Sequence, residues 1–309
     1  MFSEIIDNQR QNKSRYIREI NAPQNGICIV INNNKLTVTD GTGWVHPTRK
    51  SQYLQLIQNC ADKFTLKDSV LNINLTDVPI NGFLNFCRVK RQLEQFLLPN
   101  HRFTNDDIQI LGESATVLTY DNTVSMIRSN DKPLSEKINK IYTSCIPHKE
   151  KRQYFKYSLT HEFCTGYMYI GQPHGTCNTS PDLIKWLTSR SMAGTKRMPF
   201  IDHSKYKYVL YNDGNALSDR MRLLLPLNSV IIRSKSNYEE FYSYKLKPNI
   251  NYIEYDKIEE LENIYKKLEG SQDLVNTIIK NNRIFIENEL SYENILKYTA
   301  DIINLVCAP

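Results

Sequence analysis

The residues that decide the fold are Asp202–Pro248, DHSKYKYVLYNDGNALSDRMRLLLPLNSVIIRSKSNYEEFYSYKLKP. Six β-favouring residues, YKYVLY at 206–211, predict a buried strand. Turn-forming Asn, Asp and Gly occupy 212–215, where a positive φ is tolerated, and 220–225 predicts a helix. Residues 229–233 predict a second strand. This order of strand, turn, helix and strand predicts a right-handed βαβ unit with parallel strands.

The turn of this unit is where we expect an anion to bind. Ligands of parallel α/β sheets bind beyond the carboxyl ends of the strands. Ser218 is expected to cap the helix, whose first turn would offer free N–H groups and about half a positive charge. Arg220, in that first turn, opposes the helix dipole. Its position is best explained by a bound phosphate, which a guanidinium can hold with two hydrogen bonds.

Several short motifs of this stretch resemble one enzyme family. They are KYKY at 205–208, Gly214 with Ser218 and Arg220, SVI at 229–231, EFY at 240–242, LKP at 246–248 and YI at 252–253. In this order they resemble the CAP10-like glycosyltransferases, glycosyltransferase family 90, which include the protein O-glucosyltransferases and the fungal capsule xylosyltransferases. The match is specific over this stretch and thin elsewhere.

The resemblance implies an α/β fold of the GT-B-like kind, with two Rossmann-like domains facing across a cleft. It implies a transferase that moves a sugar from a UDP-sugar donor to a hydroxyl of a glycan or protein acceptor, with inversion of the anomeric configuration. The alternative is a catalytically inactive relative that binds a sugar nucleotide or a glycan. The expected division is an acceptor-side domain at 1–147, a donor-binding domain at 148–290, and a last helix at 291–309 that returns to the first domain.

Asp77 is the predicted catalytic base. The predicted strand SVLNINL (69–75) ends two residues before it, and the carboxyl end of a strand is where an open α/β sheet keeps its chemistry. The phrase NLTDVP also resembles the family's strand–Asp–x–Pro motif, whose Asp is the base. The alternative is that Asp77 only forms an Asx-turn before Pro79. Asp202 and His203 are the next candidates for the base.

The resemblance also implies which residues bind the donor. They are Ser158, Thr160, Gly214, Asn215, Ala216, Ser218, Arg220 and Glu240. Residues 154–160 resemble a family strand that ends in a Gly-Ser-x-Thr turn, although Tyr157 replaces the glycine and Cys164 stands where an arginine is expected. Glu240 is expected to begin a helix, either as a contact to the ribose hydroxyls or as a first-turn acid that the dipole favours.

No metal is expected in either of two places. The chain has no D-x-D pair beside a predicted strand end, so the leaving diphosphate would be stabilised by Arg220 and fixed dipoles instead. The seven cysteines include no CxxC pair. One group, His161, Cys164, His174 and Cys177, has spacing that could hold zinc, but 167–170 between its halves predicts a strand.

The composition limits which other classes of protein and partner the sequence allows. The 309 residues suit two domains, and 40% hydrophobic with 23% charged residues is typical of a soluble globular protein. The net charge of +6 is scattered without a basic stripe, which disfavours nucleic acid as a partner. No signal peptide, membrane span or ER-retention tail is recognisable, so we expect a cytoplasmic location with reduced cysteines.

Overall fold

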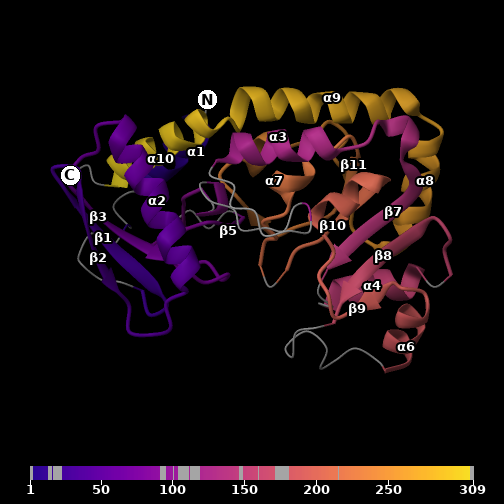
Figure 1. Ribbon diagram of the computed structural model, residues 1–309. Helices are drawn as coiled ribbons and strands as arrows, with labels where there is room; N and C mark the ends of the chain where they lie inside the picture. Colours follow the sequence, from indigo (N-terminus) through magenta and orange to yellow (C-terminus); the bar gives the residue numbers. More distant parts are fainter. Residues whose placement is uncertain are drawn as a thin grey trace.

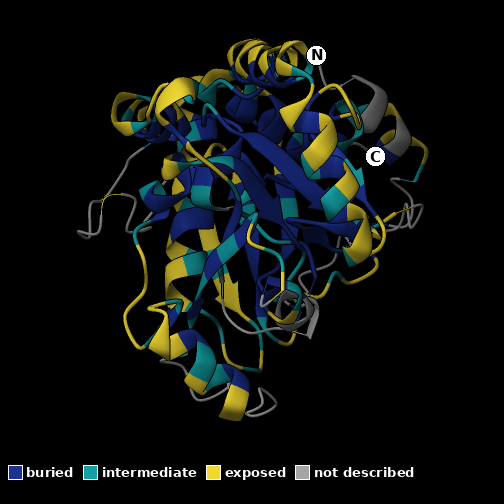
Figure 2. Ribbon diagram, turned by 90° about the vertical axis from the view of Figure 1, so that its right-hand side faces the viewer, coloured by how far each residue is buried: buried dark blue, intermediate teal, exposed yellow. Residues whose placement is uncertain are grey.

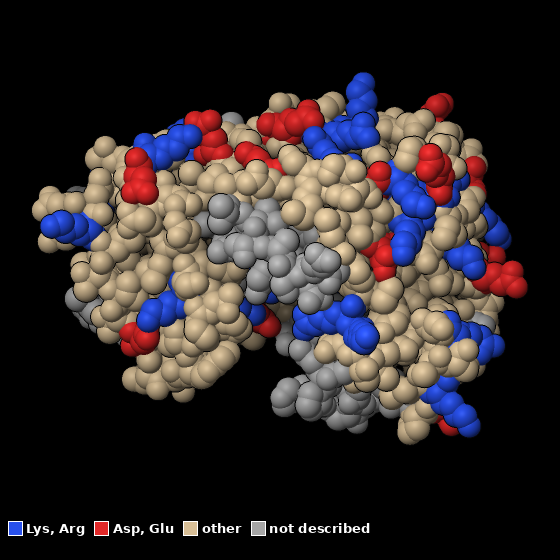
Figure 3. Space-filling view, viewed as in Figure 1, with Lys and Arg blue, Asp and Glu red and all other residues tan. Residues whose placement is uncertain are grey.

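The computed structural model describes residues 3–12, 16, 23–90, 95–99, 101–103, 111, 119–145, 149–158, 160–170, 181–214 and 216–306. Two sheets organise this part of the chain, one of five strands and one of six (Figure 1). Helices pack on both sheets, and the space-filling view is hollowed between the two lobes that the sheets form (Figure 3). We call this hollow the notch. The α/β expectation with two facing units is confirmed.

The first unit is built on the sheet β2-β1-β3-β4-β6. A hairpin begins it, and Asn33 and Asn34 make its turn with φ of 48° and 59°, as a two-residue turn requires. Because β1 is antiparallel to both neighbours, only β3, β4 and β6 run parallel, which differs from a fully parallel Rossmann sheet. Its elements are α1 (Ser3–Gln11), β1 (Gly26–Asn32), β2 (Lys35–Asp40), α2 (Pro47–Lys63), β3 (Ser69–Asn74), β4 (Leu84–Asn85), β5 (Arg88–Val89), β6 (Phe96–Leu97) and η2 (His101–Phe103).

The second unit is built on a parallel sheet in the order β13-β11-β10-β7-β8-β9. Counted along the chain this is the order 3-2-1-4-5-6 of the doubly wound fold, and it reverses between β7 and β10. The predicted βαβ unit is confirmed, with Tyr208 in register with Val230 on the parallel strand.

The elements of this unit follow in chain order. They are α3 (Tyr120–Asn130), η3 (Leu134–Glu136), β7 (Ile138–Cys145), α4 (Lys149–Ser158), β8 (Cys164–Tyr169), α6 (Pro181–Ser189), β9 (Ala193–Gly194), η4 (Phe200–Lys205), β10 (Tyr206–Tyr211), α7 (Met221–Leu224), β11 (Val230–Ser234), β12 (Tyr238–Glu239), η5 (Ser243–Lys245), β13 (Ile253–Tyr255), η6 (Ile258–Glu260), α8 (Leu261–Glu269) and α9 (Gln272–Glu289). The last helix, α10 (Tyr292–Val306), packs on α2 of the first unit, where Asn59 donates to the Tyr292 hydroxyl at 2.7 Å.

Three segments differ from their predicted structure. The sequence predicts that residues 130–140 lead into a helix, but they lead into the strand β7, which begins at Ile138; residues 154–160, expected as a strand, belong largely to α4. The helix formers that precede YFKY decide the second case, and Tyr154 is buried with its hydroxyl on the Ile141 carbonyl at 2.6 Å. Residues 238–246, expected as a helix, form β12 and a 3₁₀ turn because Glu239 joins Arg88 in a ladder between β12 and β5.

The units meet through that two-stranded ladder, so the chain between the sheets is not a free linker. β7 already belongs to the second sheet although it precedes the expected boundary at 148, and the domain boundaries otherwise stay predictions. The strands lie buried beneath helices with exposed outer faces (Figure 2). Among the described helices, none has the length and apolar character needed to cross a membrane.

Candidate active site

Arg220 lies at the switch point of the second sheet. Its Nη1 donates to the carbonyl of Ser144, at the carboxyl end of β7, at 2.6 Å, and its Nε donates to Ser218 Oγ at 3.2 Å. The guanidinium therefore joins the loop after β10 to the neighbouring strand β7, where the strand order reverses. Its Nη2 is buried and has no hydrogen-bond partner among the described residues. An unpaired buried donor costs stability, and an anionic oxygen would satisfy it.

The helix that follows is shorter than expected. α7 has four residues, and Arg220 rather than Ser218 stands at its N-cap position, so the predicted cap is wrong. Ser218 instead accepts from Arg220 through Oγ, and its carbonyl accepts from the Tyr211 hydroxyl at 2.5 Å. So short a helix has little dipole. Any attraction for a phosphate here comes from the guanidinium.

His203 lies beside Arg220 in the interior. Burial, with the Arg220 charge, lowers the pKa of the imidazole to about 3, so the ring is neutral. Its Nδ1 donates to the Phe200 carbonyl at 2.8 Å, and the ring lies against Phe200 and Tyr142. Asp202 forms an ion pair with Lys205 at 2.5 Å. An imidazole so enclosed cannot reach an acceptor hydroxyl, so His203 is a poor replacement for Asp77 as base.

Asp77 lies just past the end of β3 and has one described side-chain partner. Arg49 Nη2 contacts Asp77 Oδ1 at 2.9 Å, while its Nη1 donates to the Leu75 carbonyl at 2.6 Å. The Asp77 side chain is 42% exposed. The turn itself is held by Asn74, which accepts from the Thr76 N–H at 3.0 Å and donates to the Val78 carbonyl at 2.7 Å. The Asx-type bonds therefore belong to Asn74, and the Asp77 carboxylate is left open to the solvent.

Arg49 was missed at the level of sequence. It lies in the first turn of α2, where no acid offsets it, and a cation there opposes the helix dipole. The same anomaly drew attention to Arg220. Each arginine contacts a group at a sheet edge, so a cation near a predicted helix start was the usable signal in the sequence.

Cys87 connects the two sides of the notch. Its Sγ lies 3.8 Å from the Asp77 carbonyl, and it packs with Phe86, Ala216 and Leu217 in one small buried cluster. Burial is the main reason that the pKa of the Cys87 thiol is raised to about 12; a backbone hydrogen bond to Leu217 lowers it, and the nearby Glu240, Asp77 and Asp213 contribute to the rise. The segment after Asp77 therefore contacts the segment before Arg220.

Glu240 is buried behind this cluster. Its Oε2 accepts from the Tyr242 hydroxyl at 2.6 Å, and its Oε1 has no partner in the described part of the chain. Burial raises the pKa of the Glu240 carboxyl to about 8, although the Tyr242 hydrogen bond opposes this. The expected helix start at Glu240 is wrong, because it follows β12 instead. A carboxyl in this state is mostly neutral at pH 7.

The remaining residues that were predicted to bind the donor do not lie together in the structure. Ser158 and Thr160 precede the amino end of β8, at the edge of the sheet opposite Ser144. The Ser158 hydroxyl donates to the Phe155 carbonyl, and the Thr160 hydroxyl donates to the Tyr157 carbonyl. The structure does not bring them to Arg220. Asn215 lies outside the described residues, and Ala216 is buried.

Gly214 lies on the loop that leads to Arg220. It does not adopt the positive φ that a glycine tolerates, and a Cβ there would meet nothing within 4 Å among the described atoms. The loop is therefore open at this position, which leaves room for a ligand beside the backbone.

No group of three or more His, Cys, Asp or Glu side chains suited to a metal occurs within the described ranges. Of the possible zinc cluster, His174 and Cys177 lie outside those ranges. His161 stacks on Tyr157 at 3.7 Å between ring centroids, and Cys164 is buried with its thiol pKa raised to about 12 by burial.

The chain is similar to known glycosyltransferases in sequence. It is 27% identical over 122 residues to protein O-glucosyltransferase 1 of Rattus norvegicus, and 24% identical over 123 residues to that of Homo sapiens. Each match covers 38% of this chain and 31% of the relative, so it spans about a third of the length of these proteins.

Solved structures overlap part of the fold. Anabaena Alr3699/HepE in complex with UDP-glucose superposes with a TM-score of 0.42 at 11% identity, over 58% of this chain and 51% of that one. TarM gives a TM-score of 0.40 at 13% identity, over 56% and 37%. The profile described as Glycosyl transferase family 90 matches residues 54–305, which is well over half of the sequence. The chain therefore belongs to glycosyl transferase family 90.

Proposed function

We propose that this chain transfers a sugar from a UDP-sugar to a hydroxyl of a glycan or protein acceptor, by a single displacement without a metal ion. The observation that carries this proposal is Arg220, held at the switch point by Ser144 with its Nη2 unpartnered among the described groups. Family membership and the similarity to protein O-glucosyltransferases support a sugar donor.

Asp77 and Arg220 would divide the reaction between the two units. Asp77 takes the proton of the acceptor hydroxyl through its open carboxylate while Arg49 holds Oδ1 in place. The acceptor oxygen forms a bond to the anomeric carbon as the bond from that carbon to the diphosphate breaks. The electron pair goes to the leaving phosphate oxygen, and the Arg220 guanidinium stabilises the charge that grows there. The attack comes from the face opposite the diphosphate, so the configuration inverts.

Glu240 would contact the nucleoside on the same side. With a pKa near 8, its carboxyl carries a proton at pH 7 and can donate as well as accept a hydrogen bond. The hydroxyls of a ribose offer both kinds of partner. The carboxyl oxygen Oε1, which has no hydrogen-bond partner among the described residues, is the atom that we assign to this role.

A panel of radiolabelled UDP-sugars tests the proposal. The wild type should hydrolyse one or more of them slowly in EDTA, since water can replace the acceptor, and Asp77→Asn should not. Asp62→Asn is the matched control, because Asp62 is an exposed carboxylate of the same unit that accepts from Gln58 at 2.8 Å on the surface of α2. Binding of UDP without turnover of any donor would favour the inactive relative. A requirement for manganese would contradict the metal-free part.

A further inference from the structure

Trp44 is the most exposed of the large apolar side chains in the described part of the chain. It exposes 70% of its surface, and Val78, directly after Asp77, exposes 61%. A tryptophan normally contributes a large buried area to a core or an interface. Its neighbour Val45 does pack on the core, so the local backbone is anchored while the indole is directed outward.

The loop that carries Trp44 is fixed by close backbone contacts. The Gly41 N–H donates to the Gly26 carbonyl at 3.0 Å, and the Gly43 N–H donates to the Gln24 carbonyl at 2.5 Å. A Cβ on Gly41 would lie 2.0 Å from a backbone oxygen, and one on Gly43 would lie 2.7 Å from another. Any other residue at these two positions would push the loop away. The backbone that carries the indole is therefore held in one place, which lowers the entropy lost when a ligand covers it.

Trp44 and Asp77 leave the same edge of the first sheet. β2 and β3 flank β1, and their last residues are in register with its first two residues, Ile27 and Gly26. The two loops therefore start about 10 Å apart, since neighbouring strands are about 4.8 Å apart. The Trp44 ring lies 5.0 Å from the His46 ring, and His46 accepts from the N–H of Arg49, the residue that holds Asp77.

The surroundings of the indole fit a sugar better than a protein. Two partly exposed ion pairs, Arg49–Asp77 and Lys50–Asp40, lie at this edge. Protein interfaces are depleted of charge at their centres, whereas small-ligand sites combine an aromatic wall with a few polar groups. A pyranose ring has an apolar C–H face, which can stack on an indole, and hydroxyls at its rim, which can bond to the charged pairs.

We propose that Trp44 is the stacking platform for a sugar ring of the acceptor, and hence that the acceptor is a glycan rather than an unmodified protein. This inference rests on the proposed function, because it places the acceptor hydroxyl at Asp77. The ring that stacks on Trp44 holds the neighbouring hydroxyl in reach of the carboxylate.

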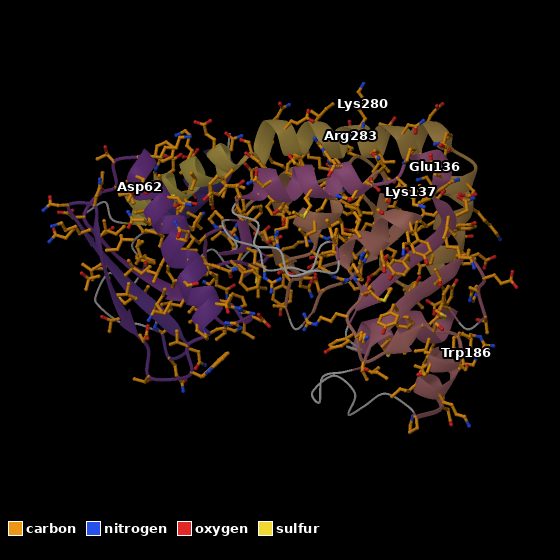
Figure 4. All side chains as sticks on the ribbon, viewed as in Figure 1. Asp62, Glu136, Lys137, Trp186, Lys280 and Arg283 are labelled. Carbon is orange, nitrogen blue, oxygen red and sulfur yellow. The ribbon has the colours of Figure 1, made fainter. Side chains whose placement is uncertain are left out.

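Fluorescence tests the platform without any turnover. The chain has two tryptophans, Trp44 and Trp186. Trp44 lies three residues before α2 begins, and Trp186 lies on α6. The labels of Asp62, on α2, and of Trp186 show how far apart these two helices are (Figure 4). In Trp186→Phe, Trp44 is the sole indole. We expect a saturable blue shift of its emission on titration with at least one of cellotriose, xylotriose and maltotriose, and none with a serine-containing peptide. Trp44→Ala, which keeps Trp186, should show no shift with the same sugars. A shift with the peptide alone, or with none of the sugars, overturns the proposal.

Transfer assays separate this inference from the proposed function. With the saccharide that shifts the emission as acceptor, Trp44→Ala should raise the acceptor KM at least about tenfold, and Trp44→Phe should raise it less. If the wild type turns over a donor but the acceptor KM is unchanged in Trp44→Ala, the proposed function stands and the proposal that Trp44 is a stacking platform is overturned. Absence of donor turnover defeats the proposed function, but the titration still decides whether Trp44 binds sugar. A wild-type dimer that Trp44→Ala makes monomeric would instead show a contact between copies.

Discussion

The two sides of the notch hold their charged groups in different ways. Arg220 is built into the second unit, with its Nη1 bonded to the carbonyl of Ser144 at the end of a central strand and its Nη2 buried. Asp77 stands on the rim of the first unit, 42% exposed, and its partner Arg49 is 24% exposed. An exposed ion pair contributes little to stability, about 0–1 kcal/mol. The difference suggests a preformed site for a phosphate on one side and an open one for a variable hydroxyl on the other.

Asp77→Asn should have the largest effect. The amide is nearly isosteric but cannot accept a proton, so transfer should fall at least about 10²-fold, the scale of a lost general base. UDP affinity should stay within about twofold, because the change is on the other side of the notch. Rates measured with saturating donor, beside those of the control Asp62→Asn, check this. Transfer at near the wild-type rate would reduce Asp77 to a surface carboxylate.

Arg220→Ala should act on the other side. Removing a charged partner of the diphosphate costs about 1.5–3 kcal/mol, so UDP should bind about tenfold or more weakly. Calorimetric titration in EDTA measures it, with a thermal melt to confirm folding. Arg190→Ala is the control, because the Arg190 guanidinium stacks on Trp186 at 4.1 Å and donates to Ser189 at the end of α6. Normal UDP affinity in Arg220→Ala would remove the phosphate site from the switch point.

Glu240→Gln should change how stability depends on pH. A folded-state pKa near 8, above the usual 4.5, means that the folded chain holds a proton that the unfolded chain releases. The free energy of unfolding should therefore fall by up to about 1.4 kcal/mol per pH unit between about pH 4.5 and 8. Glutamine, which stays neutral, should remove this slope. Urea unfolding at several pH values measures it, and Glu287→Gln, at an exposed carboxylate, should keep it. An unchanged slope in Glu240→Gln would show that Glu240 ionises freely.

Arg49→Gln should have the smallest effect. It removes a partly exposed partner that positions Asp77, an interaction worth up to about 1 kcal/mol, so kcat should fall about fivefold or less. The donor KM should not change, whereas general unfolding would alter both constants together. A loss as large as that of Asp77→Asn would mean that Arg49 itself contacts a reacting group.

The sequence was informative where local pattern and tertiary structure agree. YKYVLY and the strand at 229–233 are β-favouring runs that the core also requires, and both form where predicted. Residues 149–158 were misjudged because YFKY has a strand-like composition, while the preceding charged residues continue a helix whose Tyr154 and Phe155 reach the core.

The candidate site residues, too, could be predicted only where the local sequence carried the signal. Asp77 and Arg220 were predicted from their places after a strand together with the family resemblance, and the structure puts Asp77 just beyond β3 and Arg220 on the loop after β10. Arg49, distant in sequence from Asp77, could not be paired with it before the sheet order was known. Ser158 was expected on a turn beside the donor because residues 154–160 resemble a family motif, although Tyr157 replaces its glycine. In the structure Ser158 ends the helix α4, and its hydroxyl donates to the Phe155 carbonyl.

Proton NMR of the sugar product tests the central claim most directly, namely that one displacement occurs across the notch between Asp77 and Arg220. The measurement uses whichever UDP-sugar the wild type turns over, with the anomeric signal recorded before mutarotation or on the transferred residue. The account predicts that the first-formed product has the anomeric configuration opposite to that of the donor. A product of retained configuration would contradict it. Retention places the new bond on the same face of the anomeric carbon as the lost diphosphate, which one displacement from the opposite face cannot do.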